Sequence, residues 1–108
     1  SLKMIYLAQN VIVFGRFDAR DVLVVAVNRG ETEYFAELPV WELGLTAGTP
    51  VVSLFETGRG GYSAEAKIYQ TENGMLSVTL PPESSFVWKN LLPIGNIRNK
   101  ESLEYNFK

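Results

Sequence analysis

The side chains of this sequence that could perform chemistry are carboxylates and hydroxyls, because histidine and cysteine are both absent. Without histidine, the commonest general base and metal ligand is missing. Glu33 and Glu37 are the carboxylates to weigh as an acid and base pair, since glycosidic bond cleavage needs two carboxyl groups about 5 Å or about 6.5–9.5 Å apart. Four residues along a strand span about 13 Å. We therefore expect Glu33 and Glu37 on a solvated sheet face, and we assign no catalytic residue.

Asp18 and Asp21 are a second set of oxygen ligands to weigh, because oxygen-rich turns can bind calcium. They supply only two carboxylates, and Arg20 lies between them. A polar turn closed by local side-chain hydrogen bonds explains this pattern better. We therefore predict no metal site and no cofactor.

Glycines and serines suggest two further kinds of site. The segment TGRGGYS, residues 57–63, is rich in glycine but lacks the Gly-Lys-Ser/Thr ending and the following helix of a phosphate-binding loop. We therefore expect an ordinary flexible loop there. Ser84 and Ser85 have no histidine partner anywhere in the chain, which excludes a Ser-His-Asp nucleophile.

Aromatic side chains are the remaining candidates for ligand contact. Sugars stack on aromatic faces, so Trp41, Tyr62 and Phe35 are candidate carbohydrate contacts. The alternative is that Trp41 fills a corner of the core and Phe35 packs against a neighbouring domain. We favour the alternative and keep the three residues as candidates.

Short β-rich runs separated by turn residues must position these side chains. Their spacing of about ten residues is typical of a sandwich or barrel. We expect strands over 4–7, 11–17, 21–28, 32–38, 51–55, 64–70, 76–80 and 86–88. The prediction is an all-β, two-layer antiparallel sandwich of about eight strands and Greek-key type, formed by residues 1–90. Residues 91–108 are predicted to be a polar tail with one short helix after Asn99.

Two local patterns refine this prediction. The strand over 22–28 is apolar at both odd and even positions, so we expect it at the centre of a sheet with both faces covered. A docking partner would cover apolar area that the core leaves open. Asn73-Gly74 tolerates the positive φ angles of a type I′ turn, and Pro81-Pro82 must end the strand that follows it.

Composition excludes several kinds of partner. The net charge is −2, and no basic stripe indicates binding to nucleic acid or to a membrane surface. No apolar run approaches the roughly 20 residues that span a bilayer, and no secretory signal pattern opens the chain. Because the sequence begins with Ser1 rather than Met, we expect a trimmed piece of a longer parent.

The order of four segments resembles the C-terminal domain of α-amylase-family glycoside hydrolases, most closely the maltogenic amylase, neopullulanase and cyclomaltodextrinase group. The segments are FGRF at 14–17, a valine-rich strand ending in Asn28, the acidic-aromatic strand running into LPVW at 38–41, and GMLSVTLPP at 74–82 with its final strand. The resemblance covers about residues 4–90.

The resemblance implies a non-catalytic accessory sandwich of an enzyme that acts on starch, maltodextrins or cyclodextrins. Its implied partner is an upstream (β/α)8 catalytic barrel of the same parent, and no stretch here matches that barrel, so no catalytic residue carries over. Two alternatives remain open at this point: an independent carbohydrate-binding module and an immunoglobulin-like interaction domain. Family analogy and the lack of cysteine favour a cytoplasmic parent.

Overall fold

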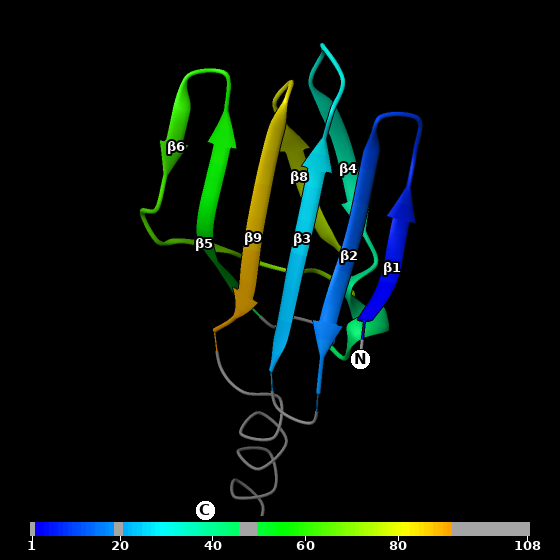
Figure 1. Ribbon diagram of the computed structural model, residues 1–108. Coiled ribbons are helices and arrows are strands. Elements are labelled where there is room, and N and C mark those ends of the chain that lie inside the picture. Colours follow the sequence, from blue (N-terminus) through cyan, green and yellow to red (C-terminus); the bar gives the residue numbers. More distant parts are fainter. Residues whose placement is uncertain (1, 19–20, 46–49, 92–108) are drawn as a thin grey trace, which may run out of the picture.

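The computed structural model describes residues 2–18, 21–45 and 50–91, whose strands form two antiparallel sheets (Figure 1). The larger sheet has the order β1-β2-β3-β9-β5-β6, with β7 also paired to β5. Its strands are β1 (Leu2–Leu7), β2 (Val11–Phe17), β3 (Val22–Asn28), β5 (Val51–Gly58), β6 (Gly61–Ser63), β7 (Lys67–Tyr69) and β9 (Ser84–Asn90). The smaller sheet pairs β4 (Tyr34–Leu38) with β8 (Leu76–Leu80). The predicted all-β, two-layer sandwich is confirmed.

Strand β3 lies at the centre of the larger sheet, between β2 and β9, as its sequence predicted. Val24 and Ala26 are fully buried on the face turned toward the smaller sheet. Leu23 and Val25 point to the opposite face and are only half-buried. No described element covers that second face, so the expected cover does not come from the described part of the chain.

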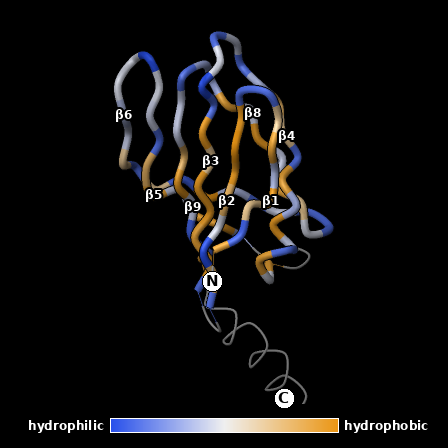
Figure 2. Tube along the Cα trace, turned by 45° about the vertical axis from the view of Figure 1, so that its right-hand side comes forward, coloured by the Kyte–Doolittle hydropathy of each residue, from blue (hydrophilic) through white to orange (hydrophobic). Residues whose placement is uncertain are grey.

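The core lies between the sheets and is closed at one end by a short 3₁₀ helix, η1 (Val40–Leu43). This helix lies in the connection between β4 and β5, and it buries Val40 and Leu43. Gly15 on β2 makes the close approach of the helix possible, because a Cβ there would lie 2.3 Å from Cδ1 of Leu43. Hydrophobic residues run along β2, β3 and β9 (Figure 2).

The chain crosses between the layers on entering and leaving each strand of the smaller sheet, as in a Greek key. The last strand, β9, therefore pairs with β3 and β5 rather than with β8. The buried side chain of Asn28 fixes two of these crossings. Its amide nitrogen donates to the carbonyl oxygens of Thr32, Leu80 and Pro81 at 3.0, 3.1 and 3.0 Å, and its oxygen accepts from the Gly30 N–H at 2.9 Å.

Two turn predictions need correction. The segment 57–63 is not a free loop, because β5 continues to Gly58 and pairs with β6 in a tight hairpin. The Asn73-Gly74 turn has the predicted positive φ angles, 55° and 78°. It joins no hairpin, however: β7 pairs with β5, β8 pairs with β4, and only a Glu72–Met75 bridge flanks the turn.

The observed strands differ from the predicted ones mainly in their first and last residues. β4 begins two residues later than predicted and β7 is shorter, whereas β9 extends over the whole of Ser84–Asn90. The tail predicted over 91–108 lies outside the described residues apart from Leu91. Within the described ranges, no helix is long and apolar enough to cross a bilayer.

Candidate functional site

Four of the carboxylates face a cation. The ion pairs join Lys3 with Glu42 (3.3 Å), Arg59 with Glu83 (2.8 Å), Lys67 with Glu56 (3.3 Å) and Lys89 with Asp21 (3.2 Å). Glu33 and Glu37 are exposed, as predicted. Among the described residues, no group of three or more potential metal ligands forms.

The remaining polar candidates serve the backbone. The Asp18 carboxylate accepts a hydrogen bond from the Asp21 N–H at 2.8 Å, which is the local turn bond that the sequence predicted. The Ser84 hydroxyl is buried and donates to the Pro81 carbonyl at 2.6 Å. Thr57 Oγ1 accepts from the Ser85 N–H at 3.1 Å. These contacts hold turns and strands in register.

Two of the three candidate sugar-contacting aromatics lie on opposite faces of the sandwich, and the third, Trp41, lies in η1. Phe35 is 62% exposed on the outer side of β4, and Tyr62 is 73% exposed on the outer side of the larger sheet. The two rings therefore point away from each other across the sandwich. Trp41 is 54% exposed and lies beside Gly74. The backbone N–H of Trp41 donates to the Gly74 carbonyl oxygen at 2.9 Å. The structure thus brings none of the three together, and Trp41 does not fill the core corner that we expected.

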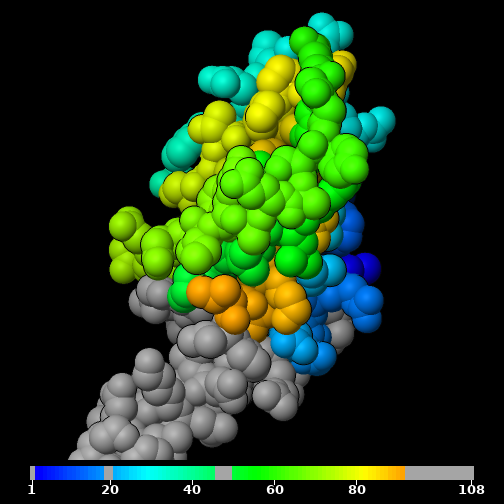
Figure 3. Space-filling view, turned by 90° about the vertical axis from the view of Figure 1, so that its left-hand side faces the viewer, coloured from blue at the N-terminus to red at the C-terminus, as the bar shows by residue number. Residues whose placement is uncertain are grey.

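Tyr62 belongs to one side of the molecule built from β5, β6 and β7, which are green in Figure 3. Its ring packs against Phe55 with centroids 5.4 Å apart. On the inner side of the same strands, the Tyr69 hydroxyl donates to Glu56 Oε2 at 2.7 Å. Burial, this hydrogen bond and the Glu56 charge raise the pKa of Tyr69 above its usual range. The phenol stays protonated and joins β7 to β5.

A second tyrosine contact joins the two layers at the other edge. The hydroxyls of Tyr6 on β1 and Tyr34 on β4 lie 2.5 Å apart, with the rings edge to face. The hydrogen bond between the Tyr6 and Tyr34 hydroxyls is the main reason that the pKa of Tyr6 is raised, with burial second. Both tyrosine contacts, Tyr69 with Glu56 and Tyr6 with Tyr34, hold strands together.

The largest unexplained feature is the face of the larger sheet that is turned away from the smaller sheet, which we call the outer face. Cross-strand pairing places its side chains in three rows. The middle row runs from Met4 through Phe14, Val25 and Val87 to Phe55. The flanking rows are mostly apolar too: Leu7, Ile12, Val27, Ser85, Thr57 and Tyr62 on one side, and Leu2, Arg16, Leu23, Lys89, Val52 and Ile68 on the other.

Exposure sets this face apart from an ordinary solvated sheet. Met4, Leu7 and Ile68 are 53%, 68% and 61% exposed, while Phe14 and Val25 are half-buried. The sequence indicated this surface through the strand over 22–28, which has apolar residues on both of its faces. Predicting the whole face required knowing which strands lie side by side.

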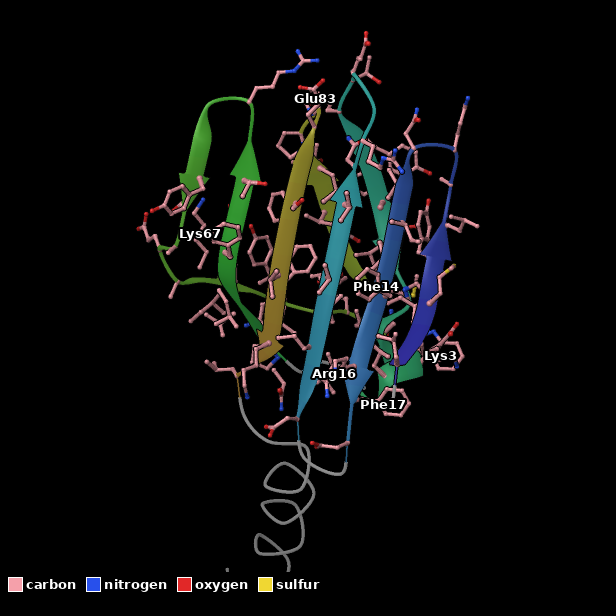
Figure 4. All side chains as sticks on the ribbon, viewed as in Figure 1. Lys3, Phe14, Arg16, Phe17, Lys67 and Glu83 are labelled. Atoms are coloured by element: carbon pink, nitrogen blue, oxygen red, sulfur yellow. The ribbon has the colours of Figure 1, made fainter. Side chains whose placement is uncertain are left out.

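A hollow of ≈190 Å³ opens at one end of the outer face. It is lined by Arg16, Phe17, Asp18, Asp21, Val22, Leu23 and Lys89. Arg16 has an exposed side chain and forms no ion pair with any described residue. Figure 4 labels Phe14 and Arg16 on β2, the strand next to β3, and the hollow is lined from β2, β3 and β9.

Comparison with known proteins gives one family and several structural neighbours. The family described as "Alpha amylase, C-terminal all-beta domain" matches residues 6–90. No curated protein matches by sequence. A GH30 endoxylanase from Clostridium papyrosolvens C71 is similar over 82% of this chain and 23% of its own, with a TM-score of 0.64 and 19% identity.

Two further neighbours show the same fold at similarly low identity. AmyP E221Q in complex with maltotriose has a TM-score of 0.63 and 18% identity, over 86% of this chain and 17% of that one. CelM2, a bifunctional glucanase-xylanase protein from a metagenome library, has a TM-score of 0.61 and 17% identity, over 77% and 16%. This chain therefore spans less than a quarter of the length of each of these neighbours.

Proposed function

Because this chain belongs to the family of α-amylase C-terminal all-β domains, we propose that it is the non-catalytic accessory domain of an α-amylase-family glycoside hydrolase. The proposed parent carries a (β/α)8 catalytic barrel upstream and cleaves α-glucosidic bonds in starch, maltodextrins or cyclodextrins. The family match over residues 6–90 is the observation that carries this proposal.

The chemistry of the described residues supports a non-catalytic role. Hydrolysis of a glycosidic bond needs two carboxyl groups that face one another across the sugar. Here Glu42, Glu56, Glu83 and Asp21 each pair with a cation, and Glu33 and Glu37 face solvent. We therefore propose that the domain supports the catalytic barrel of the parent and takes no part in the reaction itself.

The first test is the sequence that adjoins Ser1 in the natural gene. We expect the alternating strands and helices of a barrel there, and an adjoining region of another class would refute the proposal. The parent enzyme is then assayed on soluble starch, maltodextrins, β-cyclodextrin and xylan by release of reducing ends. Activity on the three α-glucans is expected; activity on xylan alone would refute the substrate assignment.

The chain by itself provides the second test. We expect it to release no reducing ends from the same substrates. Titration with β-cyclodextrin should leave tryptophan fluorescence unchanged up to millimolar ligand. Trp41 is exposed and Trp88 is fully buried, so a fluorescence change abolished by Trp41→Ala would instead identify an independent carbohydrate-binding module.

A further inference from the structure

We propose that Asn73 and Gly74 form a site of spontaneous modification, at which the folded domain converts Asn73 into isoaspartate and aspartate and thereby loosens the end of the core that η1 closes. The reacting groups are the side-chain amide of Asn73, the backbone nitrogen of Gly74 and water. This inference concerns the sandwich itself and does not depend on the proposed function.

The reaction is an intramolecular attack followed by hydrolysis. The Gly74 nitrogen attacks Cγ of Asn73, and a C–N bond forms between them. The bond from Cγ to the side-chain nitrogen breaks, and that nitrogen leaves as ammonia with the proton that the Gly74 nitrogen has lost. Water then adds to one of the two carbonyl carbons of the five-membered imide. Opening at Cγ gives aspartate, whereas opening at the backbone carbonyl gives isoaspartate, in which the main chain runs through the former side chain.

The sequence favours this reaction at one asparagine. Asparagine is among the thermolabile residues, and Asn73 is the only asparagine of the sequence that is followed by glycine. Glycine has no Cβ to crowd the attacking nitrogen. Asn28 and Asn90 are buried. Asn10 is exposed like Asn73, but it precedes Val11, whose branched side chain crowds the nitrogen.

The turn exposes Asn73 but holds it short of reaction. Its φ of 55° and the two reciprocal bonds between Glu72 and Met75, both 2.9 Å, are those of a closed type I′ turn. Such a turn holds ψ of its first central residue near about +30°, which points the next backbone nitrogen away from the side chain. The imide ring needs both on the same side, so the Glu72–Met75 bonds must open first. This bridge is isolated, so its opening disrupts no strand ladder.

The isoaspartate product does not fit the space that the turn occupies. It adds one carbon to the main chain, and Gly74 is buried against Trp41, where even a Cβ would lie 2.7 Å from Cβ of Trp41. The Gly74 carbonyl accepts the Trp41 N–H at 2.9 Å, which ties η1 to the turn. Because η1 buries Val40 and Leu43, displacing this carbonyl loosens that end of the core.

Ageing of the whole chain in solution tests the site. Samples are kept at 37 °C at pH 6 and pH 8.5 and then analysed by peptide mass mapping, with protein isoaspartyl methyltransferase to detect isoaspartate. We expect modification at Asn73 to be at least about tenfold faster than at Asn10, the control within the same chain. It should be faster at pH 8.5, because the attacking nitrogen must lose its proton.

The same samples in concentrated urea test the closed turn. We expect the unfolded chain to be modified at Asn73 at least about threefold faster than the folded chain, because the Glu72–Met75 bonds are open in it. Equal rates at Asn73 and Asn10, or a folded chain that keeps the Asn73 amide while the unfolded chain loses it, would refute the site. Equal rates in the folded and unfolded chains would refute the restraint by the turn.

Two variants test the consequence for the core. Asn73→Gly accepts the positive φ but has no amide, and Asn73→Asp carries the product's charge without the longer main chain. The aged chain that contains isoaspartate, isolated by ion exchange through its extra negative charge, should have a Tm at least about 4 °C below that of the fresh chain. Ageing should leave the Tm of Asn73→Gly unchanged, and fresh Asn73→Asp should stay within about 2 °C of the fresh chain.

Two results would refute the loosening of η1. One is an unchanged Tm in the isoaspartate form. The other is an equal fall of the Tm in aged Asn73→Gly, which would assign the fall to damage elsewhere in the chain.

Discussion

Asn28→Asp tests how the two layers are connected. The Asn28 side chain is 2% exposed, and its amide nitrogen donates to three carbonyl oxygens at 3.0–3.1 Å. Aspartate keeps the bond from the Gly30 N–H but turns an oxygen toward those carbonyls. The substitution removes the two N–H donors that the three carbonyls share, at about 1–1.5 kcal/mol each, and leaves buried acceptors unpaired, so we expect about 3 kcal/mol less free energy of unfolding at pH 7. For a domain of this size, that lowers the Tm by about 15 °C.

The cost should depend on pH in a defined direction. Burial among carbonyl oxygens raises the pKa of the introduced carboxyl in the folded state above the unfolded value of about 3.9. Below the unfolded value the group is protonated in both states, and the cost is smallest. As pH rises above the unfolded pKa, the unfolded state ionises while the folded state keeps its proton, so the cost grows until the pH passes the folded pKa.

Urea unfolding at pH 4 and pH 7 measures this effect. Asn73→Asp is the matched control, because it makes the same chemical change at an exposed turn whose φ of 55° aspartate tolerates. We expect it to change stability by less than about 0.5 kcal/mol. If Asn28→Asp costs no more than the control, or the same at both pH values, the buried amide does not hold the crossings as described.

Two further predictions concern the turn at Gly74 and the phenol of Tyr69. Gly74→Ala should lower the free energy of unfolding by about 1–3 kcal/mol, because φ is 78° and a Cβ would lie 2.7 Å from Cβ of Trp41. The control is Gly60→Ala, where a Cβ meets nothing within 4 Å, and it should be nearly neutral in the same urea titration. Equal effects of the two substitutions would contradict the argument. The pKa of Tyr69 is raised in the folded state, so its contribution to stability is present below pH 10 and is lost as pH rises above it. Tyr69→Phe should therefore flatten the fall of the urea midpoint between pH 9.5 and 11, and an unchanged slope would show that Tyr69 is not responsible.

The parts of the fold that were predictable are those where a strand's own pattern decides its place. β2 and β8 have the predicted bounds, and β8 alternates buried Leu76, Val78 and Leu80 with exposed residues, as a strand with one face in the core must. The Asn73-Gly74 turn adopts positive φ at both residues because few other pairs tolerate it. Local sterics and period-two burial suffice for these elements.

Pairing partners were not predictable from local patterns. The Asn73-Gly74 turn leads from β7 in one sheet to β8 in the other, although its sequence is typical of a hairpin. The glycines of 57–63 suggested a loop, yet Phe55 and Tyr62 pack across the β5–β6 hairpin. The positions of Phe35, Trp41 and Tyr62 likewise depend on which sheet carries each residue, and no short-range rule supplies that information.

The unequal sheets also bear on how the domain is stabilised within its proposed parent. A two-stranded sheet and η1 cover the inner face of the seven-stranded sheet, and no described element covers its outer face. By strand spacing and rise the outer face measures roughly 24 Å by 14 Å, or about 340 Å², and covering its apolar part is worth less than about 8 kcal/mol before entropic costs. This gross gain is comparable to the whole stability of a typical domain, about 5–15 kcal/mol. Any domain of the proposed parent that covered this face would add to the stability of the accessory domain, and separating the two would lower it.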